Sequence, residues 1–212
     1  MNKIIYFLIA MIGLTFISCN NEVLPSNEPH QIPSVSDMVT DLYLNNPDAS
    51  YDEVEQYVCA CFGISPSDLR YETKSNNYVS DSALKLVNKM SMVDPSVFDS
   101  KADYIYALTE IVNTEASNLN DGELDALIIA ISISADVLEL QYGGVDTKGF
   151  KDWCKEQWEN WGRCAAGIVG GAGTGALAGA GIAAIPTVGI GAGVGAIAGG
   201  ISGALTGAAS AC

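Results

Sequence analysis

The side chains able to bind a metal or attack a substrate are few in this chain, which has six cysteines and one histidine. His30 has no cluster of cysteine, serine or carboxylate side chains around it at a recognisable catalytic spacing. Cys59 and Cys61 flank a single residue, and on a helix their thiols would point about 200 degrees apart, which prevents both from binding one tetrahedral metal. We expect core packing or one disulfide for this pair. Hydrolase, metalloprotease, P-loop and EF-hand motifs are absent, so we predict a protein that is not an enzyme and holds no metal or cofactor.

The composition narrows the classes of function further. Of 212 residues, 25 are acidic and 10 are basic, and the net charge is -15. A nucleic-acid-binding protein needs a basic surface, and this chain offers none that stands out. The acidic residues are scattered rather than blocked, which is typical of a solvated surface. We therefore expect no nucleic-acid partner.

Apolar residues recur at helical spacing from residue 34 to residue 142. The first stripe consists of Val35, Met38, Val39 and Leu42. Ser50 and Glu53 form a capping box that opens the next helix, and Gly63 is its expected C-terminal cap. Further stripes of this kind cover residues 84–90, 105–112 and 124–138. We predict an acidic all-α domain over 34–142, long enough to bury a core of its own.

The N-terminus has the pattern of an export signal. Lys3 precedes the apolar run 4–17, which is too short for a membrane span, and Ser18 stands directly before Cys19. This pattern resembles the signal peptide of bacterial lipoproteins. The resemblance implies that residues 1–18 are removed and that Cys19 is acylated, which would hold the chain on a membrane. The alternative is an ordinary signal peptide with an incidental cysteine.

The residues after the signal indicate where the chain is anchored. Asn20, rather than aspartate, follows the cysteine, and by analogy with Gram-negative sorting this favours the outer membrane over the inner one. Residues 19–33 are polar and contain three prolines, which suits an extended tether. We expect a protein of the cell envelope, lipid-anchored in the outer membrane.

All three tryptophans lie in the segment 145–164. On a helical wheel its large apolar residues share one side with two cysteines, and the charged residues occupy the other side. The apolar side contains Phe150, Trp153, Trp158 and Trp161. Tryptophan favours the boundary between lipid and water, so we predict an amphipathic helix at a membrane surface. The alternative is a helix docked on the core of the acidic domain.

The segment 165–212 carries no charged residue, and its glycines recur at every fourth position. They are Gly167, Gly171, Gly175 and Gly179 in the first half, and Gly191, Gly195, Gly199, Gly203 and Gly207 in the second. Such small-residue ridges let two helices approach closely in a membrane, where each helix must satisfy its own backbone hydrogen bonds. Pro186 lies between the halves and marks the turn. We predict a glycine-zipper hairpin of two helices, each long enough to cross a bilayer.

Two cysteines would meet in such a hairpin. Cys164 opens the first arm and Cys212 closes the second, so both lie at one end, where an exported protein can oxidise them. Cys154 is a competing partner for Cys212. If Cys19 is acylated, five thiols remain, and at least one of them is free or intermolecular.

The tail from Trp153 to Cys212 resembles small glycine-zipper bacteriocins, which pair a tryptophan-bearing segment with GxxxG helices and permeabilise membranes. Gly143 and Gly144 look like a double-glycine processing site. Cleavage there implies release of the fragment Val145–Cys212 into the extracellular medium. The chain also resembles envelope lipoproteins with a two-span glycine zipper, which have structural roles. We therefore expect a membrane-interacting protein whose partners are lipid and, through the glycine zippers, further copies of itself. The alternative is a non-lytic outer-membrane lipoprotein that uses the hairpin as an anchor or oligomerisation module.

Overall fold

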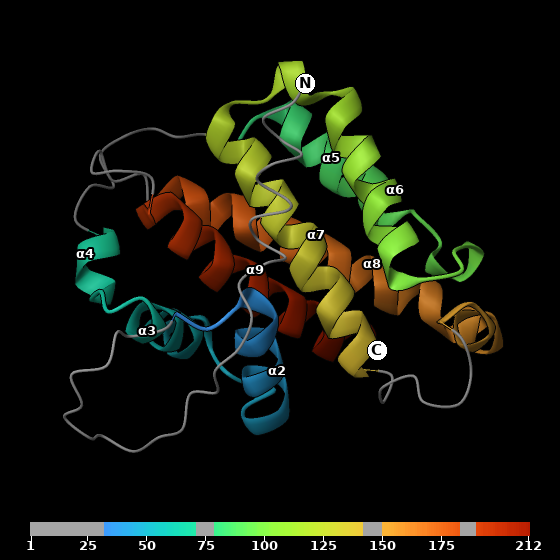
Figure 1. Ribbon diagram of the computed structural model, residues 1–212, viewed down its shortest axis with the longest axis horizontal. Coiled ribbons are helices and arrows are strands. Elements are labelled where there is room, and N and C mark those ends of the chain that lie inside the picture. Colours follow the sequence, from blue (N-terminus) through green and yellow to red (C-terminus); the bar gives the residue numbers. More distant parts are fainter. Residues whose placement is uncertain (1–31, 71–78, 142–149, 183–189) are drawn as a thin grey trace.

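The computed structural model describes residues 32–70, 79–141, 150–182 and 190–212, and every regular element within them is a helix (Figure 1). In chain order the elements are α2 (Val35–Asn45), α3 (Tyr51–Cys61), α4 (Pro66–Arg70), α5 (Asp81–Ser91), η1 (Pro95–Val97), α6 (Lys101–Thr114), η2 (Ala116–Asn118), α7 (Asp121–Gln141), α8 (Phe150–Ile182) and α9 (Ile190–Ala211). The predicted all-α class is confirmed, and so is the C-terminal pair of apolar helices.

The helix boundaries follow from local capping chemistry. The predicted capping box of α3 is present: the Glu53 amide donates to Ser50 Oγ at 3.4 Å, and the Ser50 amide donates to Glu53 Oε2 at 2.8 Å. Gly63, just past that helix, has φ +67°, a left-handed conformation that glycine adopts without steric cost. At the start of α7, Glu123 and Asn120 exchange the same pair of bonds at 2.9 and 3.1 Å. These caps satisfy amides that a helix end leaves unpaired.

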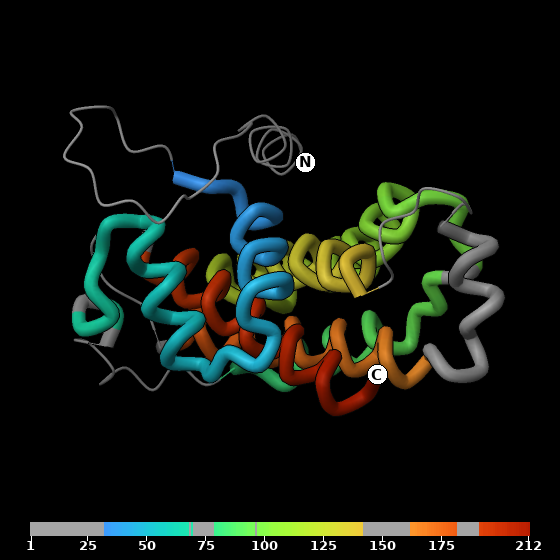
Figure 2. The backbone as a smooth tube through the Cα atoms, turned by 90° about the horizontal axis from the view of Figure 1, so that it is seen from below, coloured from blue at the N-terminus to red at the C-terminus, as the bar shows by residue number. Residues whose placement is uncertain are grey.

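The C-terminal hairpin lies at the centre of the molecule rather than at its edge. α8 and α9 run antiparallel along each other, and the other helices pack on part of their surface, leaving one flank of the hairpin uncovered (Figures 1 and 2). α7 packs on both arms of the hairpin, α5 and η1 pack on α8, and α3 packs on α9. α6 packs outside this layer, on α7 and α5. We call α3, α5, α6 and α7, together with η1, the jacket.

One hydrophobic core joins the jacket to the hairpin. Its fully buried side chains include Leu86 of α5 and Ile133 of α7, together with Ile168 of α8 and Ile201 of α9. Residues on both sides of the predicted domain boundary at 142 thus share one core. The apolar stripes of the N-terminal helices therefore pack together with apolar residues of α8 and α9.

Candidate membrane hairpin

The two arms of the hairpin contact each other through glycines. Four pairs face each other along α8 and α9: Gly167 with Gly207, Gly171 with Gly203, Gly175 with Gly199, and Gly179 with Gly195. A Cβ atom added at Gly171, Gly175 or Gly179 would lie 2.7–2.9 Å from the carbonyl carbon of the opposite glycine. Real Cβ atoms essentially never come closer than 3.0 Å to a neighbour. The backbones are therefore in direct contact, and no residue larger than glycine fits between them.

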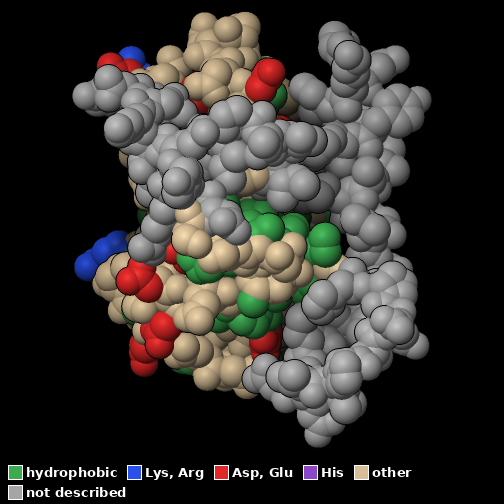
Figure 3. Space-filling view, turned by 90° about the vertical axis from the view of Figure 1, so that its left-hand side faces the viewer, with side chains coloured by type: hydrophobic (Ala, Val, Ile, Leu, Met, Phe, Trp, Pro, Cys, Tyr) green, Lys and Arg blue, Asp and Glu red, His purple; other side chains and the backbone are tan. Residues whose placement is uncertain are grey.

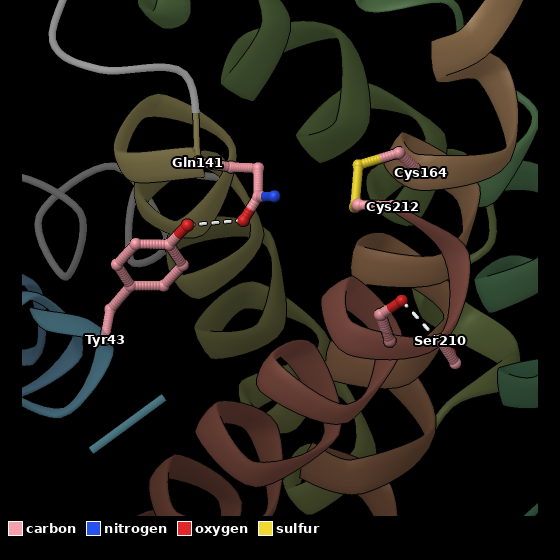
Figure 4. Close-up of a disulfide and its surroundings, with 6 residues drawn as sticks. Tyr43, Gln141, Cys164, Ser210 and Cys212 are labelled. Carbon is pink, nitrogen blue, oxygen red and sulfur yellow. Dashed lines mark hydrogen bonds between the residues drawn. A yellow bond between two sulfur atoms is a disulfide. The ribbon is translucent and has the colours of Figure 1, made fainter. Parts of the chain in front are cut away.

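A disulfide closes the open end of this hairpin. Cys164 and Cys212 are bonded, with their Cα atoms 4.6 Å apart and 48 residues apart in sequence. Figure 4 shows the bond joining the two arms, and beside it the Ser210 hydroxyl, which donates to the Gly207 carbonyl at 3.2 Å. Of the two pairings that the sequence left open, the structure contains the one between Cys164 and Cys212.

Five large side chains of the hairpin point away from the glycine contact, in addition to the buried Ile168 and Val194, which stand next to contact glycines. Each of the five stands two residues from a contact glycine, which is about 200 degrees round the helix. This set consists of Val169, Leu177, Ile197, Ile201 and Leu205, and all five are buried against the jacket. We call these five residues the aliphatic face. Among the described positions beyond residue 164, the exposed ones carry small or hydroxyl-bearing side chains or are the terminal cysteine.

Additional glycines and alanines let the jacket approach the hairpin closely. A Cβ atom at Gly173 would lie 2.8 Å from a methyl group of Val87 in α5, and one at Gly200 would lie 2.7 Å from Ile133 Cδ1 in α7. Alanines such as Ala172 and Ala176 are completely buried between these glycines. The sequence did not predict the roles of Gly173 and Gly200, because these two glycines lie outside the series that recurs at every fourth position.

Two hydroxyl side chains of the hairpin, those of Thr174 and Ser210, donate to carbonyls of their own helix. Thr174 is exposed, and its hydroxyl donates to the Gly170 carbonyl one turn earlier at 2.8 Å. Ser210 donates to Gly207 in the same way. Such bonds back to the helix allow a hydroxyl to sit on a helix in an apolar medium, because no donor is left unpaired.

Polar contacts hold the jacket together outside the apolar core. Lys101 at the start of α6 contacts Asp136 and Glu139 of α7, with both Nζ–O distances 2.5 Å. Burial lowers the pKa of the Lys101 ammonium, but the two carboxylates outweigh that effect, and the pKa is raised. Tyr43 of α2 donates to the side-chain oxygen of Gln141 at the end of α7, so that α2 is fixed to the jacket as well (Figure 4).

Most of the described acidic residues lie on the surface, whereas Glu55, Glu123 and Asp136 are buried. Figure 3 shows Asp and Glu side chains at several places on one face, with a group of hydrophobic side chains between them. Asp125 is an exposed residue, and partial burial of its carboxyl, with a smaller contribution from Asp121, raises its pKa. Among the described residues, no group of three or more His, Cys, Asp or Glu side chains is arranged to hold a metal ion.

Several predicted site residues lie outside the described part of the chain. They are Cys19, Gly143, Gly144 and Pro186, and the side chains of Phe150, Trp153, Trp158 and Trp161. The backbone from Phe150 onward is helical and continues without interruption into the first arm. Gly191 is buried at the start of α9. The described part of the candidate site is thus the glycine contact, its disulfide and the aliphatic face.

The fold and the site define a class: an all-helical protein built round an apolar two-helix hairpin. Two segments of that hairpin, Gly162–Gly181 with 20 residues and Gly191–Ala211 with 21, are long and apolar enough to cross a membrane. The same length and composition also suit a helix in the core of a protein, and half to two thirds of each segment is buried here. The chain matches no protein-family model, no curated protein and no solved structure.

Proposed function

We propose that this is an exported, lipid-anchored envelope protein that acts on membranes, with the jacket holding a bacteriocin-like hairpin until the hairpin transfers into a bilayer. One observation carries the proposal: every described large aliphatic side chain of α8 and α9 is covered by the jacket. A chain with these helices uncovered would expose a continuous apolar surface to water. In this proposal the jacket shields the apolar hairpin from water, and release of the hairpin supplies a membrane-permeabilising or self-assembling element.

A tether between jacket and hairpin tests this function. A Cβ atom at Gly170 of α8 would lie 3.9 Å from Ser91 Cβ of α5, close to the usual Cβ–Cβ separation in a disulfide, about 3.8 Å. The S91C/G170C variant should therefore form a disulfide that holds α8 in the jacket without changing the fold. The single variants S91C and G170C are matched controls, because each carries one substitution but no tether.

The assay is dye release from phosphatidylcholine vesicles by residues 20–212 with the native disulfide formed. Zwitterionic lipid avoids repulsion between an anionic surface and this strongly acidic chain. We expect release by the native protein and by both single variants, and loss of release in oxidised S91C/G170C. If the native protein neither binds nor permeabilises vesicles, the hairpin is only the core of a soluble protein and the proposal is wrong.

A non-lytic role as an outer-membrane anchor is the second candidate. It is favoured by the occupied glycine contact, because a hairpin whose two ridges already face each other is complete as an anchor and needs no further copies. Binding of the native protein to vesicles without dye release supports this role over permeabilisation.

Lipid anchoring at Cys19 has a separate test. The full chain, expressed in a Gram-negative host with labelled fatty acid, should incorporate the label and fractionate with the outer membrane. The Cys19→Ser variant should lose the label. Label in neither protein, or equally in both, contradicts acylation at this position.

A further inference from the structure

We propose that the hairpin enters the bilayer closed, with its glycine contact and its disulfide intact, and that the aliphatic face becomes the surface in contact with acyl chains. This inference rests on the proposed function and specifies how it operates. In the structure that same face packs against the jacket. Membrane entry then exchanges jacket for lipid on one side of the hairpin and leaves the contact between the arms unchanged.

The glycine contact favours entry as a unit. The two backbones are in contact at four successive glycine pairs, and even an added methyl group would collide with carbonyl groups of the opposite helix. Small residues promote helix association in lipid because they allow this close approach, and the attraction comes from many short-range contacts. Opening the arms would lose those contacts along the whole ridge. Lipid chains could not restore these contacts as fully, because the row of glycines on a separated arm is a groove that a flexible acyl chain fills poorly.

Covalent closure points in the same direction. The bond between Cys164 and Cys212 ties the two arms at the end opposite the connection between them. The arms are then joined at both ends, and separating them over their full length requires reduction. An exported protein is in a compartment where such bonds persist.

The surface that entry would expose is suited to lipid. The aliphatic face contains five branched side chains, and the segment 165–212 carries no charged residue. The hydroxyls of Thr174 and Ser210 already donate to carbonyls of their own helix. Transfer into acyl chains therefore leaves neither a charge nor these hydroxyl donors without a partner.

The glycine ridges are consequently not the surface for self-association, because each is occupied by the other arm. Copies of the protein that assemble in a membrane would meet through the aliphatic face or through the exposed flank that contains Thr174 and Thr206. A second copy of this hairpin would pack through branched side chains rather than through glycine.

Photo-crosslinking to lipid tests which side of each helix faces the bilayer. Oxidised residues 20–212 are bound to phosphatidylcholine vesicles that contain phosphatidylcholine with a diazirine in its acyl chain. After irradiation, adducts are mapped by mass spectrometry, and a non-reducing peptide map reports the disulfide. We expect adducts at Leu177, Ile197, Ile201 and Leu205, an intact bond between Cys164 and Cys212, and no adducts at the contact glycines.

Adducts at Gly171, Gly175, Gly199 or Gly203 would overturn the inference while leaving the proposed membrane function in place. The C164S/C212S variant supplies the second comparison. Closed entry predicts that the oxidised native protein forms adducts at least as efficiently as this variant. If only the variant forms adducts, the arms must open and the inference is wrong. If neither protein forms adducts in α8 or α9, the proposed function itself fails.

Discussion

Replacing one glycine of the contact between the arms by alanine should destabilise the protein, whereas the same change six residues earlier in the same helix should stabilise it. A Cβ atom at Gly199 would lie 2.8 Å from the Gly175 carbonyl carbon and 3.3 Å from the Gly179 Cα. A Cβ atom at Gly193 would have nothing within 4 Å. Both glycines lie within α9. Gly193→Ala is therefore a matched control for Gly199→Ala.

The expected magnitudes follow from two effects. Exchange of glycine for alanine inside a helix stabilises by about 1 kcal/mol, and this gain applies to both variants. Overpacking a tight contact typically costs about 1–3 kcal/mol. We expect the upper end of this range of cost at Gly199, because the obstructing atoms belong to the backbone of Gly175 and cannot rotate aside. The helix gain cancels between the variants, so Gly199→Ala should be less stable than Gly193→Ala by about 3 kcal/mol.

Thermal unfolding followed by circular dichroism measures this difference. For a chain of this size, about 1 kcal/mol corresponds to roughly 2–4 °C, so the midpoints of the two variants should differ by roughly 6–12 °C. Gly193→Ala should unfold slightly above the native protein. Equal midpoints for the two variants would refute the direct backbone contact between the arms.

Three further changes have expected outcomes. Replacing Cys164 and Cys212 by serine should lower the free energy of unfolding by about 4 kcal/mol in a denaturant titration, because the bond closes a long loop; an unchanged midpoint contradicts that bond. Lys101→Met should cost about 2–3 kcal/mol, because it leaves the buried Asp136 without its cation. Burial lowers the Lys101 pKa, but Asp136 and Glu139 together outweigh burial and the folded pKa is raised. The stability from these contacts is therefore complete below the ordinary lysine pKa and disappears as the pH rises through the folded value; an identical alkaline loss in Lys101→Met speaks against it. Burial raises the Asp125 pKa, so Asp125→Asn should be more stable than the native protein near pH 7, and the advantage should vanish as the pH falls below the aspartate pKa; a lower midpoint at pH 7 rules this out.

Much of the secondary structure was predictable because helix ends are set by nearby residues. Ser50 and Glu53 cap α3 through bonds that span three positions, and Gly63 ends it through a conformation that other residues rarely adopt. The glycine spacing predicted that two helices would approach closely. A reversal of the chain places Cys164 near Cys212, but the sequence also left Cys154 as a partner for Cys212, and the structure contains the bond to Cys164.

The glycine spacing alone did not predict the register of the hairpin, which is the alignment of the glycines of α8 with those of α9. Periodic glycines allow several alignments of two ridges, and only the packed structure places Gly171 opposite Gly203 rather than one turn away. The close approach of Gly173 to Val87 was also unpredictable, because these residues lie far apart in the chain and share no motif.

By itself, the sequence determined the helical class, several helix caps, the uncharged segment 165–212 and the small-residue ridges along which its two arms meet. Only the tertiary structure decided what covers the opposite side of that pair. Leu177, Ile201 and Leu205 are equally compatible with acyl chains and with the side chains of a protein core, because both environments are apolar and free of water. The hydrophobicity of a sequence predicts only that a surface is buried away from water. The partner that replaces water, which here is the jacket, is fixed by contacts between residues distant in the chain.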